Sequence, residues 1–90
     1  MAKPPIPRIE RYATRSVLYD TDDVGSPRSV GEAYQLSSRE CYACCALPGS
    51  WRYEERVYYT RAEAEQSMMW ARFGEDRTIP VEEIADDETD

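Results

Sequence analysis

The stretch WRYEERVYYTRAEAEQSMMWARFG, residues 51–74, carries both a strand pattern and a helix pattern. Its first nine residues are rich in the aromatic side chains that favour strands. Thr60 and Glu63 then have the spacing of a capping box, which marks the start of a helix. Gly74 stands where a glycine commonly ends one. The stretch predicts a strand over residues 51–59 and a helix over residues 61–73.

Two segments closer to the N-terminus carry weaker patterns. Residues 8–20 (RIERYATRSVLYD) are enriched in strand formers and predict a strand. Residues 21–25 (TDDVG) have the composition of a turn. Ser26 and Pro27 then suit the N-cap and the first position of a short helix. Three residues are expected along one side of that helix: Val30, Ala33 and Tyr34.

Residues 39–47 (RECYACCAL) allow two structures. Ser37 and Glu40 could cap a helix that continues through the cysteines. Alternatively, the segment is a strand that leads into a type II turn with Pro48 and Gly49 at its central positions. We favour the strand, because the turn chemistry is the sharper signal.

The predicted elements suggest a fold class. Residues 78–81 (TIPV) suit a short edge strand, because proline is tolerated at a sheet edge. The resulting order, β-α-β-β-α-β, is typical of ferredoxin-like folds. We therefore predict a single α+β domain over residues 8–81, with a proline-rich arm over residues 1–7 and an acidic tail over residues 82–90.

Side-chain periodicity divides these elements into buried and solvated faces. Alternate residues of a strand point to opposite faces, so the predicted strand 51–59 has a core face and a solvated face. The core face carries Trp51, Tyr53, Glu55, Val57 and Tyr59, and the solvated face carries Arg52, Glu54, Arg56 and Tyr58. The following helix has a broad apolar side. That side carries Ala64, Met68, Met69, Trp70, Ala71 and Phe73, whereas Arg61, Glu65 and Arg72 are expected in water.

Charge is distributed unevenly along the chain of 90 residues, whose formal net charge is −7. Residues 1–74 hold ten acidic and ten basic side chains, so the excess of negative charge belongs to residues 75–90. A general nucleic-acid binder would instead carry a basic face, so we expect no direct contact with nucleic acid. The acidic end reads as a solvated tail or as a surface for a basic partner.

Targeting signals are missing from the sequence. No apolar run approaches the length of a membrane span, and the first ten residues contain no apolar core of a secretory signal. Three cysteines, an odd number, are poor evidence for a disulfide framework. We therefore expect a cytoplasmic protein with reduced thiols and no membrane partner.

Catalytic patterns are also missing. The chain contains no histidine, the commonest general base and metal ligand. A serine or cysteine nucleophile would lack its usual partner. The acidic pairs are adjacent in sequence, so in a strand their carboxylates point to opposite faces. We therefore expect a protein that is not an enzyme and that binds no cofactor.

Cys41, Cys44 and Cys45 form a C-x-x-C-C cluster that allows three interpretations. Small cysteines often pack in a core, and we favour this interpretation. The cluster could instead hold zinc in a metal-stabilised regulator, although no histidine or second C-x-x-C completes the ligand set. Thiol–disulfide exchange would need the motif at a helix N-terminus.

The chain has more aromatic residues than a core of this size requires, with seven tyrosines and two tryptophans. Tyrosine, tryptophan and arginine are the residues that anchor protein interfaces. We therefore expect a protein-binding module, with the acidic tail steering a partner that has a basic surface. The expected partner-binding residues are Tyr12, Arg52, Arg56, Tyr58, Asp86, Asp87 and Glu88.

In profile the chain resembles the accessory proteins with which phages bind and inhibit host proteins. It is small, free of histidine, rich in tyrosine and acidic at its C-terminal end. The resemblance implies an inhibitor or modulator that acts in the host cytoplasm. The alternatives are the metal-stabilised regulator and an acidic nucleic-acid mimic, which would usually carry acids across its whole folded surface.

Overall fold

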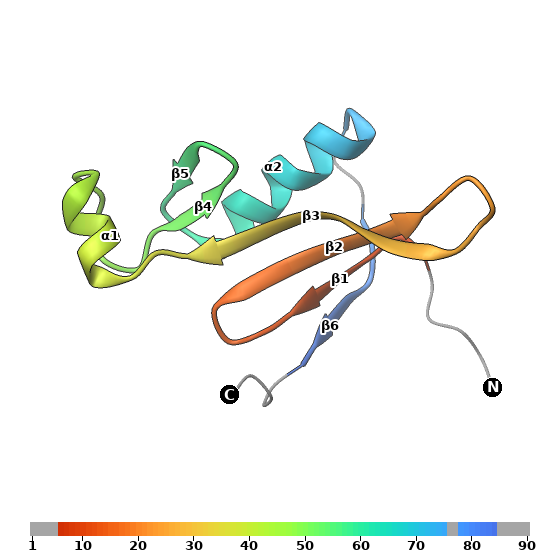
Figure 1. Cartoon of the computed structure of the whole chain (residues 1–90), viewed down its shortest axis with the longest axis horizontal. Coiled ribbons are helices and arrows are strands. Elements are labelled where there is room, and N and C mark those ends of the chain that lie inside the picture. The colour runs from red at the N-terminus through yellow and green to blue at the C-terminus, as the bar shows by residue number, and fades with distance from the viewer. Residues whose placement is uncertain (1–5, 76–77, 85–90) are drawn as a thin grey trace.

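Six strands form one sheet in the computed structural model, which describes residues 6–75 and 78–84 (Figure 1). The strands are β1 (Arg8–Arg11), β2 (Arg15–Thr21), β3 (Pro27–Gln35), β4 (Trp51–Tyr53), β5 (Arg56–Tyr58) and β6 (Val81–Glu83). They lie in the order β5-β4-β3-β2-β1-β6, and every neighbouring pair is antiparallel except β1 and β6. The helices of the described residues are α1 (Ser38–Ala43) and α2 (Arg61–Phe73). The mixture confirms the α+β class.

The order of elements is β-β-β-α-β-β-α-β, which differs from the predicted ferredoxin-like order. Two predicted strands are hairpins, so each contributes two strands instead of one. The predicted first helix is a strand, and the predicted second strand is a helix. The sheet is therefore wider than expected, and α2 is the one helix of the described residues that packs across it.

Residues 8–20, predicted as one strand, fold as the hairpin of β1 and β2. The Tyr12 N–H donates to the Arg15 carbonyl at 2.8 Å and closes the turn. Ile9 pairs with Leu18 across the two strands, and both side chains are buried. The turn explains why the apolar residues of this segment do not alternate regularly.

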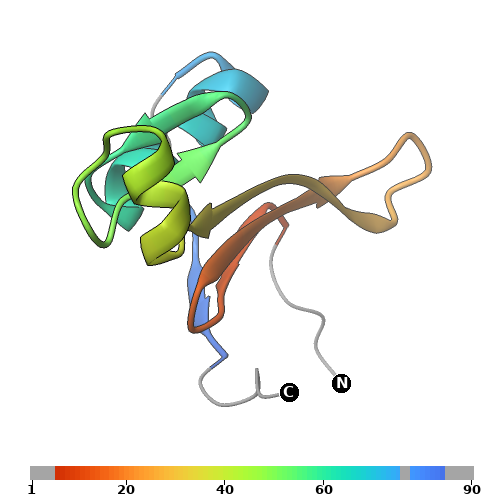
Figure 2. The ribbon, with the colours of Figure 1, turned by 60° about the vertical axis from the view of Figure 1, so that its left-hand side comes forward.

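The predicted helix after Ser26 is wrong, because this part of the chain forms β3. Pro27 is the first residue of the strand, where its missing N–H disturbs the ladder least. Gly31 lies under α2, and a Cβ there would stand 3.3 Å from the sulfur of Met68. Pairing with both β2 and β4 therefore outweighs the local capping signal. With β2, β3 forms a long hairpin whose tip projects away from the helices (Figures 1 and 2).

The predicted strand over residues 39–47 is also wrong. The alternative helix forms, although it ends at Ala43 and does not continue through Cys44 and Cys45. Ser37 Oγ accepts from the Glu40 N–H at 3.1 Å, and Glu40 Oε1 accepts from the Ser37 N–H at 2.8 Å. Hydrogen bonding from Ser37 lowers the pKa of Glu40. The turn predicted before β4 is confirmed, with Gly49 at a φ of 85°.

Residues 51–59, predicted as one strand, fold as the tight hairpin of β4 and β5. The hairpin pairs Trp51 with Tyr58 and Arg52 with Val57. Paired residues of antiparallel strands share a face, so Tyr58 lies with Trp51 on the core side. The predicted division into faces is therefore wrong beyond the turn, because Tyr58 and Val57 have exchanged sides.

Helix α2 begins and ends as predicted. Thr60 Oγ1 accepts from the Glu63 N–H at 3.2 Å. The Glu63 carboxylate accepts from the Tyr59 N–H at 3.1 Å, so the expected capping box is only half formed. Gly74, at a φ of 75°, ends the helix and donates its N–H to the Trp70 carbonyl at 2.8 Å.

The core lies between α2 and one face of the sheet. Its buried residues are Ile9, Leu18, Ala33, Trp51, Tyr53, Ala64 and Met68. Met69 and Phe73 of the predicted apolar side pack against this cluster, but Trp70 and Ala71 are exposed. They lie on the flank of the helix beside β5, which is too short to cover them.

An edge strand forms at this end of the domain as predicted, but it is β6, so only Val81 of the predicted residues 78–81 belongs to it. Glu82 and Glu83, assigned to the tail from the sequence, belong to β6. Residues 1–5 of the predicted arm and 85–90 of the predicted tail lie outside the described residues. None of the helices described has the length and apolarity needed to cross a membrane.

A buried carboxylate joins α2 to β1 and β2. Glu65, expected in water, is 4% exposed. It accepts from Arg11 Nε at 2.9 Å, from Arg11 Nη2 at 2.7 Å and from Ser16 Oγ at 2.6 Å. The hydrogen bond to Glu65 is the main cause that raises the pKa of Arg11. Arg11 also pairs with Glu83 at 3.2 Å, which extends the cluster to β6.

The substitution Glu65→Ala should lower the free energy of unfolding by about 3 kcal/mol, because it leaves the buried Ser16 hydroxyl without its partner and removes the two-bond ion pair with Arg11. Urea denaturation followed by circular dichroism measures the change. The matched control is Glu32→Ala, whose carboxylate pairs with Arg15 at 3.5 Å on the surface. It should change stability by less than about 0.5 kcal/mol. Equal losses in the two variants would contradict a special role for Glu65.

Candidate binding surfaces

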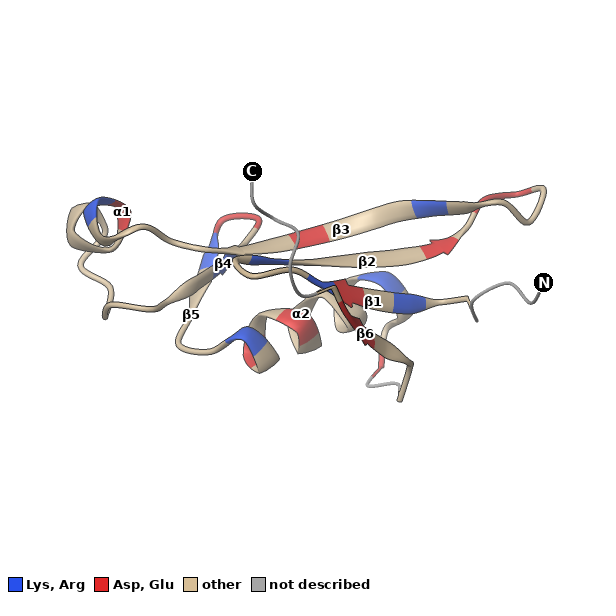
Figure 3. Ribbon diagram, turned by 90° about the horizontal axis from the view of Figure 1, so that it is seen from below, with Lys and Arg blue, Asp and Glu red and all other residues tan. Residues whose placement is uncertain are grey.

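One face of the sheet is left uncovered by the helices of the described residues (Figure 3). Side chains alternate along each strand, so they divide between the side of α2 and the opposite side. Because Ile9 points toward α2, its neighbours Arg8 and Glu10 point to the opposite side. We call this surface the open face. It carries three tyrosines and three arginines: Arg8, Tyr12, Arg15, Tyr19, Tyr34 and Arg52.

Two arginines of the open face stack on tyrosine rings. The Arg8 guanidinium lies 4.5 Å from the ring centre of Tyr19, and that of Arg15 lies 4.3 Å from the ring centre of Tyr12. The Tyr12 hydroxyl donates to Glu10 at 2.9 Å, and this hydrogen bond raises the pKa of Tyr12. These contacts restrict the rotation of the side chains, and ordering of this kind lowers the entropic cost of binding at a surface.

Tyr34 and Arg52 lie side by side on the open face, as partners across β3 and β4. The Tyr34 side chain is 38% exposed. Arg52 is half-buried, and its Nε donates to the Glu54 carbonyl at 2.9 Å. Tyrosine and arginine are both enriched among the residues that anchor protein interfaces.

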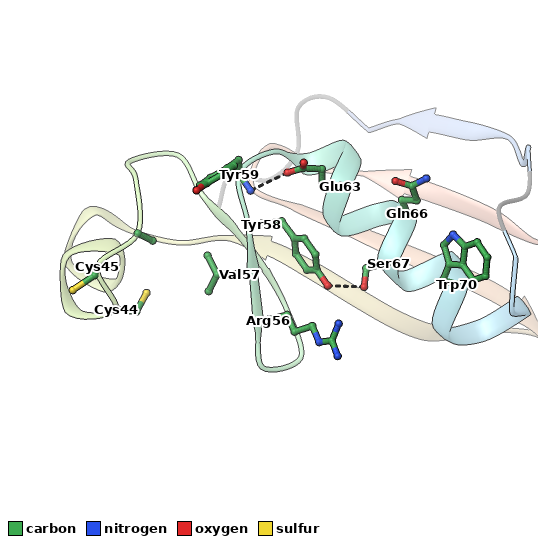
Figure 4. A pocket seen from close by; sticks show the side chains of 11 residues that line it. Cys44, Cys45, Arg56, Val57, Tyr58, Tyr59, Glu63, Gln66, Ser67 and Trp70 are labelled. Atoms are coloured by element: carbon green, nitrogen blue, oxygen red, sulfur yellow. Dashed lines mark hydrogen bonds between the residues drawn. The ribbon is translucent and has the colours of Figure 1, made fainter.

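A groove follows β5, with the loop after α1 on one side and α2 on the other (Figure 4). We call it the β5 groove; its volume is about 780 Å³. Tyr59 and Trp70 line it and are 68% and 51% exposed. The Tyr58 hydroxyl reaches across to α2 and lies 2.7 Å from Ser67 Oγ. A smaller depression of about 320 Å³ continues along α2 and shares Arg56 and Trp70 with the groove.

The predicted partner-binding residues divide between these two surfaces. Tyr12 and Arg52 lie on the open face, whereas Arg56 and Tyr58 lie in the β5 groove. The hairpin turn separates the two pairs, because it places Arg56 and Tyr58 on the side of the sheet that faces α2. The predicted acidic residues lie outside the described part of the chain; they are Asp86, Asp87 and Glu88.

Four exposed aromatic residues are missing from the sequence-based set: Tyr34, Tyr42, Tyr59 and Trp70. Tyr34 was assigned to a helix, so its place on a sheet surface could not be inferred. Trp70 follows Glu63 and Ser67 at helical spacing, which is a signal for a shared flank of α2. Its apolar character pointed to the core instead.

The cysteines do not share one environment. Cys41 is 3% exposed within α1, whereas Cys44 and Cys45 are exposed after its last turn. The packing interpretation is therefore right for Cys41 and wrong for the other two. The Cys44 thiol donates to the Glu40 carbonyl at 3.1 Å. Within residues 6–75 and 78–84, no three cysteine, aspartate or glutamate side chains converge to hold a metal ion.

No protein-family model, curated protein or solved structure matches this chain. Function is therefore inferred from the chemistry of the two surfaces. Both combine aromatic rings with arginine, the residue types most enriched at the energetic centres of interfaces. They differ in shape: the open face is broad and charge-balanced, whereas the β5 groove is narrow and follows a sheet edge.

Two adjacent tyrosines test the assignment of the groove. The substitution Tyr58→Ala should lower the free energy of unfolding by about 2 kcal/mol, because it removes core packing and the bond to Ser67. Tyr59→Ala, at an exposed position, should change it by less than about 0.5 kcal/mol. Equilibrium denaturation compares the two. Equal small changes in the free energy of unfolding would show that Tyr58 lies on the surface, as the sequence suggested.

The cysteines should differ in reactivity, because a thiol must reach solvent to be alkylated. Iodoacetamide under native conditions should modify Cys44 and Cys45, whereas Cys41 should react at least about 100-fold more slowly, through local opening. Peptide mass spectrometry over a time course measures each rate. Addition of denaturant should equalise them. Rapid native labelling of Cys41 would contradict its burial.

Proposed function

We propose that this protein is a non-enzymatic binding module that docks on another protein through its open face. The observation that supports this most is the gathering of three tyrosines and three arginines on one uncovered side of the sheet. Large side chains of these types contribute a disproportionate share of interface energy. A partner that covers this side would also complete the burial of the sheet.

The charges of the open face favour a protein partner over a nucleic acid. Arg8 pairs with Glu10 at 2.9 Å, and Arg15 approaches Glu32 at 3.5 Å. Phosphate backbones are held by uncompensated cations, and here the cations have carboxylate neighbours. A protein surface with both signs of charge fits such a pattern better.

The acidic C-terminal segment would steer a basic partner toward the protein. Residues 75–90 carry eight acidic side chains and one arginine. Such a segment attracts a basic surface over a distance and raises the association rate. We place this docking in the cytoplasm, where it would inhibit or modulate a host protein if a phage encodes the chain.

Affinity capture from a lysate of the source cell or host tests the open face. The full chain should retain one dominant protein, and the double variant Tyr34→Thr/Arg52→Thr should retain at least about tenfold less of it, because two neighbouring anchors are lost. Threonine favours strands, so the variant should keep its melting temperature within a few degrees.

The matched control carries the same exchange on the other surface, as Arg56→Thr/Tyr59→Thr. It should retain the protein as the unaltered chain does. Loss in the control alone would move the binding site to the β5 groove. A protein that binds equally to all three baits, or no protein above background, would refute docking through the open face.

A further inference from the structure

Strand β5 leaves one edge of the sheet unpaired within the described residues. It is the last strand in the sheet order, and its inner edge pairs with β4. The β5 groove lies along its outer edge, between the loop after α1 and α2 (Figure 4). An unpaired strand edge is a template for another strand, and natural edges are often blocked by proline or lysine. The sequence of β5, Arg-Val-Tyr, contains neither.

The register of the hairpin leaves the main chain of Val57 free. Tyr53 and Arg56 flank the two-residue turn, so their pair exchanges hydrogen bonds. Bonded and non-bonded pairs alternate along antiparallel strands, so Arg52 and Val57 form a non-bonded pair. The N–H and C=O of Val57 therefore point away from β4, along the open edge. No turn or loop of the described residues bonds to them.

Opposite charges mark the two ends of the β5 groove. Arg56, at the start of β5, is exposed, and its side chain forms no ion pair or hydrogen bond with the described residues. Glu63, in the first turn of α2, lies just beyond the end of β5 and presents its carboxylate there. The groove is therefore positive where β5 begins and negative where β5 ends. A segment that runs antiparallel to β5 and carries the same two charges matches this pattern.

We propose that two copies of this chain pair β5 against β5 across a twofold axis at Val57. Each Val57 N–H donates to the Val57 carbonyl of the other copy, and Arg56 of each copy faces Glu63 of the other. The pairing covers three side chains that are at least 39% exposed: Val57, Tyr59 and Trp70. An isologous contact of this kind closes on itself and gives a dimer rather than a fibre.

This dimer goes beyond the proposed function, which uses the open face rather than the β5 edge. A twofold axis at a strand edge stands perpendicular to the sheet, so both open faces point the same way. Two docking surfaces on one side of the dimer would raise its apparent affinity for a partner with paired or repeated sites. The dimer itself requires no such partner.

Sedimentation equilibrium of the full chain tests the proposal over micromolar to submillimolar concentrations, with a reductant present to prevent disulfides between exposed cysteines. The unaltered chain should dimerise reversibly. Arg56→Glu or Glu63→Arg alone should weaken the dimer at least about tenfold, because each places like charges opposite each other. The double variant should restore the dimer, because Glu at position 56 then faces Arg at position 63.

Two further variants separate the edge from the charges. Val57→Pro removes an N–H that β4 does not use, so it should abolish the dimer and leave a folded monomer. Arg28→Glu, a matched reversal in β3 away from the groove, should leave the dimer unchanged.

Several results would overturn the proposal. They are a monomer at every concentration, a dimer whose dissociation constant is unchanged in Arg56→Glu and Glu63→Arg, and a dimer that is lost instead in Tyr34→Thr/Arg52→Thr. A monomer whose partner capture is abolished by Val57→Pro would show that the groove takes a strand of another protein. Sedimentation reports the dimer and the Tyr34→Thr/Arg52→Thr capture reports the open face, so each proposal can fail alone.

Discussion

The contact between Glu65, Arg11 and Ser16 sets the position of α2 on the sheet. One turn earlier in the helix, Arg61 donates to the carbonyls of Tyr12 and Ala13 at 2.6 and 2.9 Å. Two charged residues of α2 therefore bind the same end of the β1–β2 hairpin, and together they fix the direction of the helix axis. A carboxylate buried without these donors would cost several kcal/mol, so the helix cannot rotate about its axis and keep the fold. Rotation would also expose Met68, which packs over Gly31.

The fixed axis of α2 decides which residues are left for binding. One flank of the helix packs on the core, and the flank with Ser67 and Trp70 stands free beside β5. That flank becomes a wall of the β5 groove because β4 and β5 are only three residues long. The open face exists for a related reason, since only one long helix covers a sheet that is six strands wide.

The sequence allowed the secondary structure to be predicted best where signals lie close together along the chain. The cap at Thr60, the stop at Gly74 and the turn at Gly49 are all such local signals, and all three form. Two of the failures involve partners that are distant in sequence. Strand β3 follows from pairing on both of its edges, which overrides the helix signal at Pro27. The burial of Glu65 depends on a residue 54 positions away.

The candidate sites were harder to predict, because a turn of two residues reverses the phase of every side chain after it. Reading residues 51–59 as one strand put Arg52 and Tyr58 on one face, but the turn places them on opposite sides. The excess of tyrosine was nevertheless an informative signal. Of the seven tyrosines, only Tyr53 is buried in the core. The others cover the open face, flank the β5 groove or, as Tyr42 does, stand on α1.

Val17, on the open face, is only 6% exposed, so the large side chains around it already shield the sheet from water. A partner on this face, as proposed, would therefore meet a closely packed aromatic and arginine layer rather than a bare sheet. Its binding would depend on specific ring and guanidinium contacts more than on the removal of exposed aliphatic surface.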